Sequence, residues 1–156
     1  MSSTKMNSFY NATKDVFKNM LDIDISELDS SQKGENGKKV NVSVEFVGDV
    51  EGKVDFRFPE TTVLNIVKTL SGMEITNVDD FAMSAVGEIS NIISGNAATN
   101  LSGQQLKCDI KAPQITIENE SAATDDNLTI FLQTNAGSLD EQIGLSVKKV
   151  NTNSPV

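Results

Sequence analysis

Residues 40–58 alternate apolar and polar side chains in two runs separated by glycines, and this pattern constrains the fold more than any other stretch. The apolar members are Val40, Val42, Val44 and Phe46, then Val54, Phe56 and Phe58. A period of two places these side chains on one face of an extended chain. Gly48 and Gly52 frame the expected turn. We therefore predict an antiparallel hairpin with one buried face.

Two stretches on either side of this hairpin have apolar residues at helical spacing. The first covers residues 6–21, and the second covers residues 63–70. Pro59 stands where it can end the hairpin and open the second helix. Gly72 stands where it can terminate that helix in a left-handed conformation. We therefore predict one helix before the hairpin and one directly after it.

A third helix is predicted over residues 78–93. Asn77 is the expected N-cap, and two aspartates follow in the first turn, where they favour the positive end of the helix dipole. We expect the helix to fray between Gly95 and Gly103. Its predicted buried face consists of Val78, Phe81, Ala82, Ala85, Val86, Ile89, Ile92 and Ile93.

The remainder of the chain favours extended structure. Residues 106–117 alternate as a strand that a proline bends or places at an edge, and residues 127–134 and 142–150 read as two more strands. Polar, glycine-containing sequence at residues 29–39 and 135–141 predicts loops.

Three helices and about five strands, joined as hairpins instead of alternating units, predict an α+β fold. The sheet should be mainly antiparallel, with the helices packed on one face. We expect one domain over residues 1–156, with a loose tail at residues 151–156.

Composition excludes several functions. The chain has no histidine, a single cysteine (Cys108) and a single arginine (Arg57), so histidine catalysis, disulfides and thiolate metal clusters are ruled out and no metal site is expected. A net charge of -9 disfavours nucleic acid as a partner. No glycine-rich phosphate loop occurs. The absence of a long apolar run or signal peptide predicts a cytoplasmic protein without a membrane partner. Cys108 is expected to be a small core residue.

A narrow polar stripe runs beside the apolar face of the third helix. Ser84, Glu88, Asn91 and Gly95 are spaced by three and four residues, which aligns them along one side. A carboxylate and an amide would point outward together, next to a notch at the glycine. The simpler interpretation is a solvated face with Gly95 as C-cap. A second Glu-x-x-Asn at residues 74–77 shows that the spacing alone is not diagnostic.

The segment DDFAMSAVGEISNIISGNAATNLS resembles the signature helix of the CheC/CheX/FliY family of chemotaxis phosphatases. The residues that match the family pattern are Asp79, Glu88, Asn91 and Gly95. MNSFYNATKDVFKNML resembles the first helix of the family, and LSGQQLKCDIKAPQITI resembles the segment after the signature. The resemblance covers residues 6–150. Because only one signature helix is present, it points to the single-motif, CheX-like form.

The resemblance implies a phosphatase acting on the aspartyl phosphate of a CheY-type response regulator, which holds its own Mg²⁺. Asn91 would orient the attacking water, Glu88 would pair with the regulator's lysine, and Ser84 and Gly95 would belong to the partner-binding surface. The resemblance implies no cofactor for this chain. It does imply a homodimer joined through sheet edges. The alternatives are a non-catalytic module that binds a receiver domain or a flagellar component, and a structural dimer scaffold. The cognate regulator and its pathway are not predicted.

Overall fold

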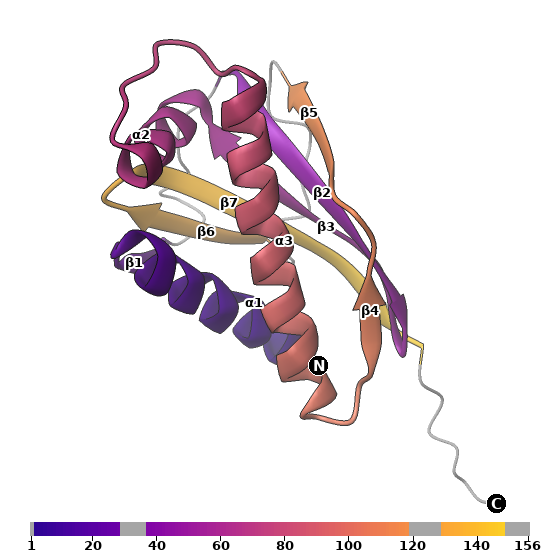
Figure 1. Cartoon of the computed structure of the whole chain (residues 1–156). Coiled ribbons are helices and arrows are strands. Elements are labelled where there is room, and N and C mark those ends of the chain that lie inside the picture. The colour runs from indigo at the N-terminus through magenta and orange to yellow at the C-terminus, as the bar shows by residue number, and fades with distance from the viewer. Residues whose placement is uncertain (1, 29–36, 119–128, 149–156) are drawn as a thin grey trace, which may run out of the picture.

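One antiparallel sheet forms the back layer of the molecule (Figure 1). The computed structural model describes residues 2–28, 37–118 and 129–148. Within these ranges the strand order is β1-β6-β7-β3-β2-β4, with β5 also paired to β2. The strands are β1 (Ile25–Leu28), β2 (Lys39–Gly48), β3 (Val50–Pro59), β4 (Cys108–Ile110), β5 (Gln114–Glu118), β6 (Thr129–Thr134) and β7 (Gly137–Val147).

The helices lie together on one face of this sheet (Figure 1). They are α1 (Ser2–Val16), which continues into a π-helical turn η1 (Phe17–Leu21), α2 (Glu60–Ser71) and α3 (Asp80–Ser102). Pro59 precedes α2, and Gly72 ends it with φ 75°. The predicted α+β fold, with a mainly antiparallel sheet and three helices on one face, is confirmed.

The predicted hairpin is present as β2 and β3, but its turn is tighter than expected. Gly52 lies inside β3 opposite Phe46, and the chain reverses at Asp49. A Cβ atom at Gly52 would overlap the carbonyl oxygen of Gly144 on β7, and φ there is +134°. This glycine therefore permits close approach between β3 and β7 and does not form the turn.

Three other predictions of strands and loops are corrected. The strand β1 was not predicted, and the extended segment 106–117 is divided into β4 and β5 around its proline. β7 begins at Gly137, where a loop was expected, because the Thr134 hydroxyl accepts hydrogen bonds from the amides of Ala136 and Gly137 and closes a two-residue turn. Most of the predicted loop at residues 29–39 lies outside the described residues. The whole of the predicted tail at residues 151–156 also lies outside them.

The core lies between the sheet and the helices. The inward face of β2 and β3 is closed to solvent at every apolar position, and Phe9 of α1 meets Phe46 edge-on with ring centroids 5.6 Å apart. The largest fully buried side chains are Phe9, Phe17, Phe46, Phe56, Phe58, Ile66, Ile89, Ile93, Leu101, Ile130, Leu132 and Leu139. Burial of this apolar surface is the dominant favourable contribution to folding.

One carboxyl group lies within this core. Glu141 of β7 is completely buried, and its Oε2 lies 2.5 Å from the hydroxyl of Thr13 on α1. Burial raises the pKa of Glu141 to about 8, although the hydrogen bond with Thr13 lowers it. The Thr13 hydroxyl, which has one proton, also lies 2.8 Å from the carbonyl oxygen of Phe9. The Thr13 hydroxyl is the donor of both contacts, and its single proton can serve only one of the two acceptors at a time.

Candidate functional site

The helix α3 begins two residues later than the sequence predicts. Its N-cap is Asp79, not Asn77: the backbone of Asp79 is extended, and its Oδ1 accepts a hydrogen bond of 2.9 Å from the amide of Ala82. An aspartate cap satisfies an otherwise unpaired amide and places negative charge at the positive end of the helix dipole. The residue that matches the family pattern at the start of the helix thus has a structural role.

The helix continues without a break to Ser102. The predicted fraying beyond Gly95 is wrong, as is the interpretation of Gly95 as a C-cap, since this glycine lies inside the helix. Asn100 near its end donates to the carbonyl oxygen of Ser8 on α1. The buried side of α3 consists of Ala82, Val86, Gly87, Ile89, Ser90, Ile93, Ser94, Ala97 and Leu101. Packing along the whole length therefore holds the outer face of α3 in a fixed position.

The polar stripe lies on this outer face. Ser84 and Glu88 are exposed, and Asn91 and Gly95 are partly exposed. No hydrogen bond or ion pair joins the side chain of Glu88 or Asn91 to any described residue, so both polar head groups are available to another molecule. Residues three apart on a helix have Cβ atoms about 5–6 Å apart. The structure therefore brings all four predicted residues onto one accessible surface.

A recess borders the C-terminal end of this stripe. A Cβ atom at Gly95 would meet nothing within 4 Å, so the space beside this glycine is open. The recess has a volume of about 350 Å³ and is lined by Gly95, Ala98, Thr99, Ser102, Cys108, Asp109 and Ile110. Cys108, predicted to be a core residue, is only partly buried: it packs against the edge of the core and also faces this recess. Burial and the nearby Asp109 and Asp49 raise the pKa of its thiol, which disfavours the reactive thiolate.

Two features of α3 were missed or misassigned from sequence. Phe81 was predicted to be buried, but 52% of it is exposed, because the first turn of α3 presents Ala82 to the core instead. Gly87 is buried directly before Glu88, and a Cβ atom there would lie 2.5 Å from Cδ1 of Ile115 on β5. A glycine within a helical pattern was the available signal, since it costs about 1 kcal/mol relative to alanine.

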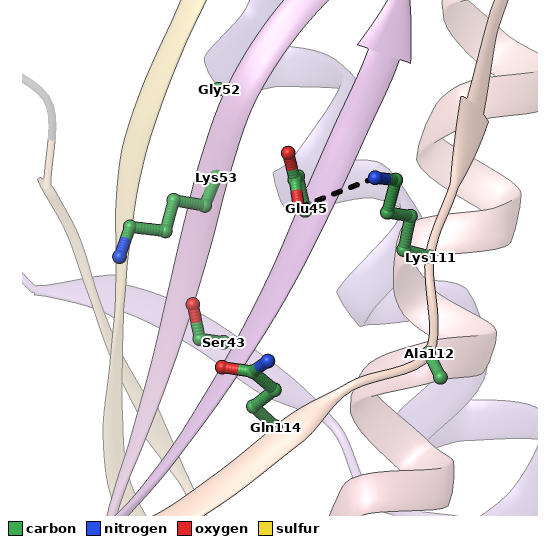
Figure 2. Close-up of a pocket in the computed structure, with 7 residues that line it drawn as sticks. All are labelled: Ser43, Glu45, Gly52, Lys53, Lys111, Ala112 and Gln114. Atoms are coloured by element: carbon green, nitrogen blue, oxygen red, sulfur yellow. Dashed lines mark ion pairs between the residues drawn. The ribbon is translucent and has the colours of Figure 1, made fainter.

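A second recess lies on the face of the sheet that points away from the helices (Figure 2). Its volume is about 380 Å³, and it is lined by Ser43, Glu45, Gly52, Lys53, Lys111, Ala112 and Gln114. An ion pair of 3.9 Å joins Glu45 Oε1 to Lys111 Nζ, and both side chains are more than half exposed. Neither Glu88 nor Asn91 lines this recess, so it is separate from the polar stripe.

Two features are absent from the described residues. No group of three or more His, Cys, Asp and Glu side chains is arranged to hold a metal ion in that part of the chain. Nor does any helix there have the length and apolar character that crossing a membrane requires.

Comparison with protein families gives a match over the central part of the chain. A family model described as chemotaxis phosphatase CheX matches residues 40–134. The chain belongs to the CheX family. Over 69 residues it is 33% identical to the CheY-P phosphatase CheX of Thermotoga maritima. That alignment spans 44% of this chain and 44% of the Thermotoga protein.

Solved structures show the same fold. The chemotaxis protein CheX from Vibrio vulnificus has a TM-score of 0.79 at 18% identity, covering 91% of this chain and 99% of that one. A CheC-like superfamily protein from Shewanella sp. PV-4 has a TM-score of 0.75 at 22% identity, covering 94% and 99%. A CheX–CheY–BeF3–Mg+2 complex from Borrelia burgdorferi has a TM-score of 0.64 at 22% identity, covering 90% and 96%.

Proposed function

We propose that this protein removes phosphate from the aspartyl phosphate of a CheY-type response regulator. The observation that carries the proposal is the pair of unengaged head groups, Glu88 and Asn91, on a helix held along its full length. Membership of the CheX family and the name of the Thermotoga relative support the same activity. The regulator's aspartate, and not a residue of this chain, carries the phosphoryl group.

The reaction requires little more than positioning. A water oxygen attacks phosphorus in line with the acyl phosphate bond, that bond breaks, and the regulator's aspartate leaves as a carboxylate while the proton of the water passes to the released phosphate. Asn91 would orient the water. Its amide oxygen accepts a hydrogen bond from the water, and its amide nitrogen donates one to a phosphoryl oxygen. The regulator brings its own Mg²⁺. Orientation of this kind can lower a barrier by several kcal/mol.

Glu88 would dock the regulator. Three residues of helix place it about 4.5 Å along the axis from Asn91, so one carboxylate and one amide can enter a shared pocket together. Its negative charge is suited to a cationic side chain, the regulator's active-site lysine in our assignment. Neither α3 nor its N-cap contains a lysine or arginine that would compete for Glu88. Ser84 and Gly95 would form the surrounding contact surface. We also propose that the protein forms a homodimer through a sheet edge.

The test is phosphate release from a phosphorylated CheY-type receiver in Mg²⁺, with wild type, Asn91→Ala and a matched control. Asn96→Ala removes the same amide from an exposed position of the same helix, away from the stripe. We expect Asn91→Ala to lower kcat about 100-fold, the effect of losing one oriented hydrogen-bonding group, and Asn96→Ala to retain activity. Glu88→Ala should raise KM as well as lower kcat.

Two outcomes would contradict the proposal. Wild-type turnover by Asn91→Ala would show that the amide does not position the water. Binding of the receiver without any acceleration by the wild type would favour the non-catalytic binding module.

A further inference from the structure

Phe81 is the exception among the phenylalanines of this chain. The other six are at most 8% exposed, whereas Phe81 is 52% exposed on the first turn of α3. Single exposed apolar residues are common on protein surfaces and need no function. The position of Phe81 relative to the polar stripe is what makes it informative.

Phe81 extends the stripe by one turn. At 100° per residue, Phe81, Ser84, Glu88, Asn91 and Gly95 fall within an arc of about 80° on one side of the helix. Ten residues of helix separate Phe81 from Asn91, a distance of about 15 Å along the axis. The exposed aromatic ring and the proposed catalytic amide therefore lie on the same side of the helix, at the two edges of this arc.

We propose that Phe81 is an aromatic anchor of the surface that binds the regulator's receiver domain. This inference rests on the proposed function, because it assumes that a phosphorylated regulator is presented to Asn91. A globular domain of about 100 residues has a radius of gyration of about 13 Å and so a width of roughly 30 Å. A standard interface covers about 800 Å² on each partner, or roughly 16 Å around its centre. A receiver centred on Asn91 therefore reaches Phe81.

The chemistry of the surface is consistent with this partner. The described charges on α3 and its cap are all negative, from Asp79, Asp80 and Glu88, which suits a partner with a cation beside its phosphorylated site. Aromatic side chains supply a large rigid contact area and are frequent among the residues that dominate binding energy. Phe81 gives this otherwise polar stripe an apolar contact of that kind.

The experiment compares Phe81→Ala with Met73→Ala, an apolar residue of similar exposure (56%) outside α3. The probe is a CheY-type receiver activated with beryllium fluoride and Mg²⁺, titrated to obtain Kd, together with KM and kcat for the phosphorylated receiver. We expect Phe81→Ala to raise Kd and KM roughly 10- to 30-fold with kcat at saturation within about twofold of wild type. Met73→Ala should leave both constants unchanged, and Phe81→Leu should recover part of the affinity.

The results separate this inference from the proposed function. An unchanged Kd for Phe81→Ala, in a protein whose wild type binds the receiver, overturns the anchor whatever the catalytic activity. An equal loss in Met73→Ala also overturns it, because the effect would not be specific to the stripe. A wild type that binds but does not hydrolyse refutes the phosphatase and still allows the anchor to be tested by Kd. A wild type that does neither, across a panel of receivers, overturns both.

Discussion

The buried carboxyl of Glu141 should make the stability of this protein fall as pH rises. The group is completely buried between β7 and α1, with Thr13 as its hydrogen-bond partner. Glu141→Gln keeps the size and an oxygen that accepts the hydrogen bond from Thr13, but it cannot ionise. Comparing the two proteins across pH therefore isolates the effect of the ionisable group.

The magnitude follows from the two pKa values. Burial raises the pKa of Glu141 from an ordinary 4.5 to about 8 in the folded protein. Between these values the unfolded chain has released the proton while the folded chain still holds it. Folding stability then falls by about 1.4 kcal/mol per pH unit and becomes level above pH 8. By pH 7 this destabilisation amounts to roughly 3 kcal/mol, a large part of the stability of a typical domain.

Urea unfolding of wild type and Glu141→Gln at intervals from pH 5 to pH 8.5 measures this effect. We expect the stability difference between the two to grow in favour of the variant by about 1.4 kcal/mol per pH unit up to pH 8. Glu45→Gln, at an exposed position of β2, controls for the substitution itself. A difference between wild type and Glu141→Gln that stays constant over this range would refute the reasoning, because Glu141 would then titrate alike in both states.

Two further predictions concern α3. Asp79→Ala should lower the free energy of unfolding by about 1 kcal/mol through loss of the helix cap, whereas Asp79→Ser should retain most of the stability; equal losses in urea titrations would contradict the capping role. Gly95→Ala should raise the free energy of unfolding by up to about 1 kcal/mol, because alanine favours the helix and its Cβ enters open space. A lower thermal midpoint for Gly95→Ala would show that the notch is not empty.

Features that depend only on residues close together in the sequence were predictable. Alternation identified β2 and β3, and helical spacing identified the three helices, because each pattern is complete within a short segment. β1 was not predictable in this way: four residues carry little pattern, and its partner β6 pairs Ile25 with Thr134, more than 100 positions away. The early start of β7 depends on a hydrogen-bonded turn at Thr134 that the glycine-containing sequence did not reveal.

The same distinction applies to the candidate site. The alignment of Ser84, Glu88, Asn91 and Gly95 is local helix geometry and was predicted. The exposure of Phe81 depends instead on which part of α3 overlies the sheet, which is determined by packing of the complete fold.

The pairing of β3 with β7 has a consequence for how the chain folds. These strands join residues 50–57 to residues 140–147 in the middle of the sheet, and Lys5 of α1 donates to the carbonyl oxygen of Leu145 on β7. Contacts this distant in sequence require large loops to close first, so we expect folding on the millisecond-to-second scale. During synthesis α3 emerges before β7 exists to complete the centre of the sheet. Because α3 packs on β2, β4 and β5 and not mainly on β7, the helix that carries Glu88 and Asn91 can dock on its own part of the sheet before β7 has paired.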